Sequence, residues 1–139
     1  MDEKLQRTLY ELEVGKKQME ELNRQGQIIE QSLSELDETV SALKDYARMQ
    51  VGTQSLVPIG AGSYVRSKIS DTDSVLVGVG AGFSVEKKIP DAVETLKQRR
   101  EQLAKSLSQV NKTVGELGVR LSQLNSAAES MMSQRGPQQ

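Results

Sequence analysis

Few residues in this chain of 139 amino acids could carry chemistry. It contains no cysteine and no histidine, which excludes thiol chemistry, cysteine-based metal sites and the commonest general base. The first candidate for ligand binding is the glycine-rich run Gly78-Val79-Gly80-Ala81-Gly82. A phosphate-binding loop needs a helix directly after it, and no Gly-Lys-Ser/Thr is present here. A strand-like run follows instead, which favours a turn over a nucleotide site.

Two other local motifs have simple explanations. Asp71 and Asp73 could ligate a metal, but no histidine, cysteine or glutamate lies nearby in sequence, so a role in a turn is favoured. The run Asn111-Lys112-Thr113 matches a glycosylation sequon, yet it lies in the middle of a predicted helix and no export signal is visible. Neither motif predicts a functional site.

A basic cluster is interrupted only by Glu101 and has no aromatic residues between its members, which favours a solvated helix face over a nucleic-acid site. Its members are Lys97, Arg99, Arg100 and Lys105. No nucleophile is paired with a base anywhere. The sequence therefore predicts a protein that is not an enzyme and that needs no cofactor and no metal.

The composition excludes further classes. Charged residues make up 27% of the chain with a net charge of −1, which gives no general attraction to nucleic acid or to an anionic membrane. Aromatic residues are only 3%, so narrow aliphatic seams are expected in place of a broad core. The stretch from Met1 to Leu12 is charged throughout and does not read as a signal peptide. The longest apolar run falls far short of the roughly 20 residues that span a bilayer. We therefore expect a soluble, cytoplasmic protein.

The elements that position these residues begin with a heptad repeat from Pro90 to Met131. An apolar pair recurs every 3.5 residues over six heptads, which is typical of a coiled coil. Arg100 is the one polar residue among the twelve seam positions. These positions are Val93, Arg100, Leu107, Val114, Leu121 and Ala128 in one series, and Leu96, Leu103, Val110, Leu117, Leu124 and Met131 in the other.

Residues 2–50 repeat the pattern less strictly and predict a second long helix. Its seam positions are Leu5, Leu12, Met19, Gly26, Leu33, Val40 and Ala47, with Thr8, Gly15, Leu22, Ile29, Leu36, Leu43 and Gln50. Residues 1–50 hold 11 acidic and 7 basic side chains, whereas residues 90–139 hold 5 acidic and 7 basic. Opposite average charge favours pairing of the two helices with each other as an antiparallel hairpin. Pairing of each helix with another chain is the alternative.

The pattern leaves the register of the two helices open. Leu12 could face Leu124 or, one heptad further along, Met131.

Residues 51–89 lose the heptads and gain glycine, serine and β-branched residues. Four strand-like runs, 55–59, 64–69, 75–79 and 83–89, are separated by glycine-rich and aspartate-rich turns and predict two β-hairpins. Because isolated hairpins are marginal in water and expose their edges, we expect these strands to pair with strands of other chains. The candidate assembly residues are Leu56, Val57, Ile59, Tyr64, Val65, Ile69, Val75, Leu76, Val77, Val79, Phe83 and Val85.

The predicted organisation therefore has four parts. Residues 1–50 form the first coiled-coil helix, 51–89 the two hairpins, 90–135 the second helix, and 136–139 a flexible tail. Pro90 lies at a helix start, where its missing N–H costs nothing. The predicted fold class is mainly α, a long antiparallel coiled-coil hairpin whose two central β-hairpins assemble into a β-barrel between subunits.

The free ends of the two predicted helices break the coiled-coil rule that residues off the seam are polar. Apolar residues off the seam include Leu9, Tyr10, Val14, Val119 and Met132. Small or polar seam residues there suggest a looser seam, and such an end could re-pack around varied apolar partners. The predicted client-binding tip residues are Leu5, Leu9, Tyr10, Leu12, Val14, Leu124, Met131 and Met132. Random scatter is the alternative, and Ile28 in the middle of a helix agrees with it.

The order of helix, two hairpins and helix, without cysteine or histidine, resembles the alpha class of the prefoldin family. The runs Leu56-Val57-Pro58-Ile59-Gly60, Val75-Leu76-Val77-Gly78-Val79-Gly80-Ala81-Gly82 and Val85-Glu86-Lys87-Lys88 support the resemblance. It covers the chain up to Met132, and two hairpins distinguish the alpha class from the single-hairpin beta class.

The resemblance implies a heterohexamer of two alpha and four beta subunits with a β-barrel platform. It implies an ATP-independent holdase that captures non-native proteins and delivers them to a group II chaperonin in archaeal or eukaryotic cytosol, with no nucleic acid and no membrane as partner. The family has no short motif that assigns client contacts, so the tip residues remain an inference from this sequence. The competing interpretation is a structural coiled-coil scaffold or tether without client binding. Client identity and the source organism stay open.

Overall fold

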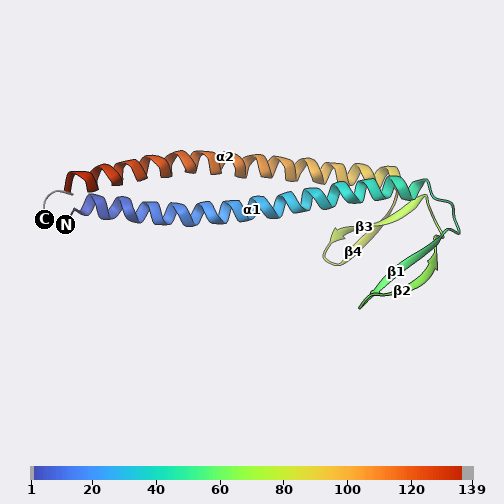
Figure 1. The fold of residues 1–139 in the computed structure, drawn as a ribbon. Helices are drawn as coiled ribbons and strands as arrows, with labels where there is room; N and C mark the ends of the chain where they lie inside the picture. The colour runs from blue at the N-terminus through green and yellow to red at the C-terminus, as the bar shows by residue number, and fades with distance from the viewer. Residues whose placement is uncertain (1, 136–139) are drawn as a thin grey trace. The chain divides into compact units, whose positions relative to one another are not determined.

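A computed structural model describes residues 2–135 of the chain; the predicted flexible tail, 136–139, lies outside them. Along the chain, one long helix precedes four strands and a second long helix follows them (Figure 1), which confirms the predicted mainly helical fold with two antiparallel hairpins. The elements are α1 (Glu3–Ala47), β1 (Gln54–Gly60), β2 (Ser63–Lys68), β3 (Ser74–Gly80), β4 (Phe83–Lys88) and α2 (Ile89–Arg135). The chain divides into two compact units, a terminal unit of residues 1–32 and 103–139 and a central unit of residues 33–102.

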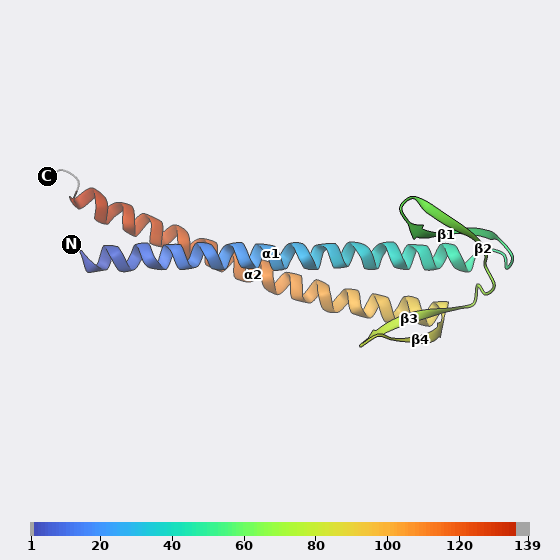
Figure 2. The same cartoon turned by 90° about the horizontal axis from the view of Figure 1, so that it is seen from below.

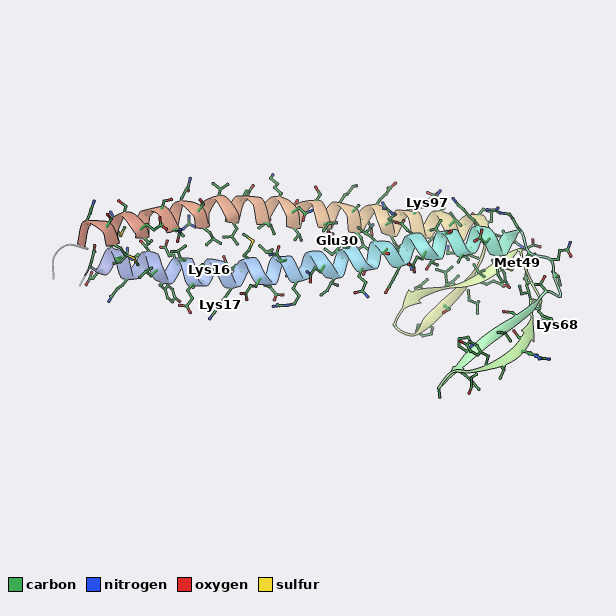
Figure 3. All side chains as sticks on the ribbon, in the orientation of Figure 1. Lys16, Lys17, Glu30, Met49, Lys68 and Lys97 are labelled. Carbon is green, nitrogen blue, oxygen red and sulfur yellow. The ribbon has the colours of Figure 1, made fainter. Side chains whose placement is uncertain are left out.

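In the terminal unit, α1 and α2 pack antiparallel along the predicted seam (Figure 2). Leu5, Leu12 and Ala128 form a buried cluster, against which Leu121 and other seam residues of α2 pack. Side chains off the seam point outward, as Lys17 does from α1 (Figure 3). The buried and half-buried positions therefore follow the predicted heptads.

Small seam residues tighten this unit, so the expectation that they loosen it was wrong. Gly15 is buried, and a Cβ atom built on it would clash with Leu121 Cδ2 and lie 3.9 Å from Leu117 Cδ1. A Cβ on Gly26 would lie 3.7 Å from Val110 Cγ1. Because a glycine leaves room for the facing leucine or valine, the two backbones approach closely and the seam closes.

The same contacts settle the register. Gly15 of α1 faces Leu121 of α2. Because the helices are antiparallel, three residues back along α1 correspond to three residues forward along α2. Leu12 therefore lies opposite Leu124 and not opposite Met131. A polar contact agrees with it, since Arg120 Nη2 lies 3.7 Å from Glu11 Oε2.

In the central unit, the one polar seam residue of α2 makes a paired contact with α1. Arg100 Nε donates to Asp37 Oδ1 at 2.6 Å, and Arg100 Nη2 donates to Asp37 Oδ2 at 3.3 Å. This hydrogen bond and the positive charge hold the pKa of Asp37 below its usual value of 3.8. Asp37 thereby gives the charged seam residue of α2 a partner on α1.

The α1 helix ends at Ala47, before the last predicted seam position. Ala47 and Gln50 are exposed, so the heptad contacts stop at Leu43. The N–H groups of Arg48 and Met49 bond to carbonyls three residues earlier, which tightens the last turn, and Gly52 follows with φ of 94°. The chain therefore leaves the helix before a further seam residue can meet α2.

The two hairpins are copies of one another, offset by 20 residues. β1 pairs with β2 from Gln54↔Lys68 to Gly60↔Ser63, and β3 pairs with β4 from Ser74↔Lys88 to Gly80↔Phe83. Seven of the fifteen aligned residues are identical. The two pairs form separate two-stranded sheets. The predicted runs extended too far at Ile69, which follows β2, and at Ile89, which begins α2.

The hairpin turns explain the glycine-rich runs. Gly80, Ala81 and Gly82 have φ angles of 101°, 51° and 79°, and the turn of the first hairpin has matching values. These left-handed conformations favour glycine and strain a side chain mildly at the central alanine. The run Gly78–Gly82 is thus the end of β3 and the turn into β4, as the strand-like sequence after it predicted.

Gly15→Leu tests how closely the helices of the terminal unit approach. The added side chain would overpack the contact with Leu121, so we expect a loss of about 1–3 kcal/mol in the free energy of unfolding, measured by urea denaturation followed by circular dichroism. The matched control is Gly115→Leu, where no atom lies within 4 Å of the new Cβ and higher helix propensity adds up to about 1 kcal/mol. Equal effects of the two variants would contradict the packing described above.

Asp37→Asn tests the contact with Arg100. Because the folded-state pKa of Asp37 is lowered, its carboxylate stabilises the fold above pH 4 and that contribution disappears as the pH falls through the lowered pKa. The wild type should therefore be more stable than the variant at pH 7, and the difference should shrink as the pH falls below 3.8 and through the lowered pKa. Asp45→Asn is the control, since Asp45 meets Arg48 only within one exposed helical turn at 3.6 Å. A stability difference that does not decrease on acidification would refute the role of ionisation.

Candidate functional site

The predicted tip residues separate into two groups in the terminal unit. Leu9, Tyr10, Val14 and Met132 are exposed, with exposed fractions between 37% and 67%. Leu5 and Leu12 are buried at 3% and 6%. Leu124 and Met131 are half-buried and pack against the cluster that those two leucines form. The exposed group can meet a partner directly, whereas the buried group is available only if the two helices separate.

Large apolar side chains that are exposed on the helices, within residues 2–135, all belong to the terminal unit. They are Leu9, Tyr10, Val14, Ile28, Val119 and Met132. All except Ile28 lie between residues 9 and 14 of α1 or between residues 119 and 132 of α2, in the parts of the two antiparallel helices toward the chain ends. Concentration in one place argues against random scatter, and Ile28 remains the exception.

A shallow groove of about 210 Å³ lies among these side chains. Tyr10 and Val14 of α1 line one side, and Leu121 and Leu124 of α2 line the other. Gly15 also lines the groove, beside the Leu121 side chain that packs against it. Glu11 and Arg120 also line the groove and give it a charged border. An apolar groove with a charged border can bind an apolar segment without selecting a particular sequence.

Most of the candidate assembly residues are exposed on the hairpins. Nine of the twelve are exposed by 44% or more. They are Leu56, Val57, Ile59, Tyr64, Val65, Leu76, Val79, Phe83 and Val85. Ile69 and Val75 are half-buried and Val77 is buried. Two-stranded sheets with this much exposed apolar surface cannot provide their own core.

The two hairpins differ in how they meet α2. Val77 of β3 is 7% exposed, while its repeat equivalent Val57 of β1 is 44% exposed. Arg99 of α2 donates from Nη2 to the Gly78 carbonyl of β3 at 2.7 Å. Ala92 is fully buried although it lies off the heptad seam. The second hairpin therefore packs on the first turns of α2, and within the described residues no hydrogen bond links the first hairpin to a helix in this way.

This contact corrects the interpretation of the basic cluster as a solvated helix face. Lys97 and Lys105 are exposed, but Arg99 is half-buried against β3 and Arg100 bonds to Asp37. Sequence reasoning missed Arg99 and Ala92 as packing residues. The available signal was the spacing of Ile89, Ala92, Leu96 and Arg99, which puts them on one helical stripe beside the seam.

Asp71 is a turn residue, as expected. Its Oδ1 accepts hydrogen bonds from the backbone N–H groups of Asp73 at 2.7 Å and Ser74 at 3.2 Å. These bonds lower the pKa of Asp71. They fix the connector between the hairpins directly before β3 begins.

Among residues 2–135, no three acidic, histidine or cysteine side chains gather closely enough to hold a metal ion. In the same part of the chain, neither helix is apolar enough over a sufficient length to cross a membrane.

The described features define a class of protein in which antiparallel helices are joined through β-hairpins whose apolar residues remain uncovered. Comparison with known proteins identifies the family. The family model described as prefoldin subunit matches residues 16–134, so the chain belongs to the prefoldin family. Prefoldin is a family of chaperones rather than enzymes.

Relatives and solved structures agree with this assignment. Prefoldin subunit alpha of Methanococcoides burtonii is 32% identical over 108 residues, covering 78% of each chain. Prefoldin subunit alpha of Methanobrevibacter smithii is 30% identical over 141 residues, covering 96% of each chain. The predicted resemblance to the alpha class is thereby confirmed.

Two solved structures share the fold. One is a chain of filamentous prefoldin from Methanocaldococcus jannaschii, with a TM-score of 0.74, 22% identity, and coverage of 83% of this chain and 95% of that one. The other is the prefoldin beta subunit of Thermococcus strain KS-1, with a TM-score of 0.62, 18% identity, and coverage of 94% and 93%. At these identities the likeness establishes the fold alone.

Val77→Ala tests the packing of the second hairpin, with Val57→Ala at the equivalent repeat position as control. Removing two methyl-sized groups from a buried site should lower the free energy of unfolding of the isolated chain by about 1–2 kcal/mol, and the control by less than half as much. Urea denaturation followed by circular dichroism measures both. Equal losses would show that the two hairpins are equally exposed in solution.

Proposed function

We propose that this chain is the alpha-type subunit of a heterohexameric holdase in the cytoplasm, with two alpha and four beta subunits. It binds non-native proteins without ATP and releases them to a group II chaperonin. It has no catalytic activity and uses no cofactor. The observation that carries the proposal is the gathering of exposed apolar side chains at the chain ends of the terminal unit, while exposed helical positions in 29–45 and 97–113 are polar or no larger than alanine.

The hairpins supply the means of assembly in this proposal. Residues 51–89 form the assembly segment, and the segments 1–50 and 90–135 form the arm that binds clients. The exposed apolar residues of both hairpins favour this division, because strands of this kind are stable when other strands cover them. Beta-class chains are the partners that would complete the barrel.

Binding without a nucleotide demands many weak contacts. A single groove of about 210 Å³ holds one or two apolar side chains, so a single arm binds weakly. Several arms on one platform raise the effective concentration of each site for the same client. Leu5 and Leu12 contribute only when a client separates the helices, since both are buried in the seam, whereas the half-buried Leu124 also lines the groove and Met131 packs against the seam cluster.

A purely structural scaffold is the competing function. It accounts for the seam and the hairpins, but gives no reason for apolar residues to be exposed at one place on the helices.

The combined variant Leu9→Ser, Val14→Ser, Val119→Ser and Met132→Ser separates the two functions. These residues are exposed, so the variant should fold and assemble normally, as checked by circular dichroism and by the mass of the complex with beta-class chains. The concentration needed to suppress aggregation of an unfolded client should rise about tenfold, because apolar contacts are lost on every alpha arm.

The matched control is Ile28→Ser, which removes an exposed apolar side chain of the terminal unit that lies farther from the chain ends. It should leave suppression of aggregation unchanged. Full suppression by the fourfold variant at unchanged complex mass would favour the scaffold.

A further inference from the structure

The shallow groove of the terminal unit continues along one side of the two helices into a larger one. The larger part has a volume of about 510 Å³ and is lined by Leu22 of α1 and Leu117 of α2, with polar residues around them. It shares Gln18, Leu117 and Arg120 with the part of about 210 Å³ described above. Together the two parts form a lateral groove that runs from Tyr10 to Leu22 along α1. Its length is about 18 Å, since a helix rises by about 1.5 Å per residue.

No charged pair covers the seam at the larger part of the lateral groove. Glu11 and Arg120 flank the seam and meet across it, with Oε2 3.7 Å from Nη2. One heptad further from the chain ends, the equivalent flanking positions are Gln18 and Thr113, and both line the larger part. Neither side chain carries a charge, so no ion pair can bridge the seam between them. The seam is therefore accessible from this side.

Seam leucines that the two helices cover only in part line the lateral groove. Leu22 of α1 and Leu117, Leu121 and Leu124 of α2 belong to this set, and each is half-buried. Val14 lies beside them and is 37% exposed. A third helix laid along α1 and α2 would cover this apolar stripe, as the helices of a bundle cover one another.

A helical segment suits the lateral groove better than an extended one. The groove lies between α1 and α2, whose backbone N–H and C=O groups are already bonded within each helix. An extended segment would find no backbone partners there, whereas a helix satisfies its own backbone groups. A length of about 18 Å corresponds to roughly 12 helical residues, whose apolar side chains at i, i+3, i+4 and i+7 share one face.

The charges at the border of the lateral groove specify what should flank that apolar face. Three carboxylates line the groove, those of Glu11, Glu21 and Glu116, against the single guanidinium of Arg120. Arg120 is engaged with Glu11, and Glu21 meets Arg24 of its own helix. Among residues 2–134, no cation forms an ion pair with Glu116. Lysine or arginine beside the apolar face would therefore complement the border, and glutamate there would be repelled.

We propose that the lateral groove binds an amphipathic helical segment of a client protein, one that carries lysine or arginine beside its apolar face. The segment packs on Leu22, Leu117 and Leu121 as a third helix, and its cations face Glu21 and Glu116. This inference rests on the proposed function and specifies which client segments the arm of this chain selects. Because the half-buried leucines are reached from the side, α1 and α2 stay paired while the segment binds.

Three synthetic peptides of about 14 residues test the proposal on the full chain by fluorescence anisotropy. The first has leucines at i, i+3, i+4 and i+7 with lysines beside them. The second replaces these lysines by glutamates, and the third replaces one central alanine by proline, which breaks the helix. The lysine peptide should bind about tenfold more tightly than either of the others. Equal affinity for the lysine and glutamate peptides, or for the lysine and proline peptides, would overturn the proposal.

The double variant Glu21→Lys, Glu116→Lys reverses the charge of the border. Both residues are exposed, so circular dichroism should show an unchanged helix content. The dissociation constant of the lysine peptide should rise about tenfold, and that of the glutamate peptide should fall. Glu38→Lys with Glu101→Lys is the matched control, since it changes the net charge equally at exposed residues of the central unit. Equal effects of the two double variants would contradict the proposal.

Photo-cross-linking locates the peptide independently, on a chain that has no cysteine of its own. Gln18→Cys labelled with benzophenone should cross-link to the lysine peptide, because Gln18 lines both parts of the lateral groove. Lys17→Cys with the same label should not, because Lys17 points outward from α1 and does not line the groove (Figure 3). Equal cross-linking from the two positions would overturn the proposal, whatever the charge variants show.

Two further readouts separate this inference from its alternatives. Sedimentation equilibrium of the chain and of the Glu21→Lys, Glu116→Lys variant should give the same mass, and a change of mass without peptide binding would assign the groove to a second copy of the chain. Suppression of client aggregation is measured separately with beta-class chains present. Intact suppression without peptide binding at the groove refutes this inference alone, whereas peptide binding at the groove without suppression refutes the proposed function alone.

Discussion

Two paired helices can hide only one narrow stripe of side chains on each, and the rest of this structure depends on that limit. Among residues 2–134, the buried side chains of the terminal unit are small or aliphatic, as in the cluster of Leu5, Leu12 and Ala128. Gly15 compensates for the narrow stripe by letting the facing Leu121 side chain enter more deeply. The seam gains van der Waals contact because the two backbones approach closely. A chain with few aromatic residues cannot gain the same contact from large side chains.

The same limit leaves apolar residues without cover in both units. In the terminal unit, Leu9, Tyr10 and Val14 lie outside the seam, and Tyr10 and Val14 line a shallow groove. In the central unit, most apolar residues of the hairpins are exposed. A globular protein would place such residues in a core. In a subunit of the prefoldin family they are available to other chains, which in our proposal are clients in one unit and fellow subunits in the other.

Polar residues supply alignment in both units. Arg100 interrupts an otherwise apolar seam and finds Asp37 across it, while Arg120 meets Glu11. Exposed ion pairs of this kind add little stability, but an alignment that brings like charges together is penalised.

The sequence by itself determined the local elements, because each depends on neighbours within a few residues. The 3.5-residue period specified both helices and their buried stripes, from Leu5 to Leu43 and from Val93 to Met131. Glycine pairs around Ala61 and Ala81 specified the hairpin turns, and Pro90 marked the start of α2. The predicted strands differ from the observed ones only at their ends, for example at Ile69 and Ile89, which follow the last residues of β2 and β4.

Only the tertiary structure decided which surfaces meet. Because heptads repeat, shifting one helix by seven residues gives the same pattern of apolar residues. The fit of Leu121 against Gly15 was therefore needed to decide the register of the two helices. Val57 and Val77 are equivalent in sequence, yet only Val77 is buried, because the second hairpin alone is joined directly to α2. From the sequence, the Arg99 side chain is expected to face solvent as its lysine neighbour does. In the structure it donates a hydrogen bond to the Gly78 carbonyl of β3. Local spacing fixes a conformation, but contacts between distant segments depend on shape and on chain connection, which periodicity does not encode.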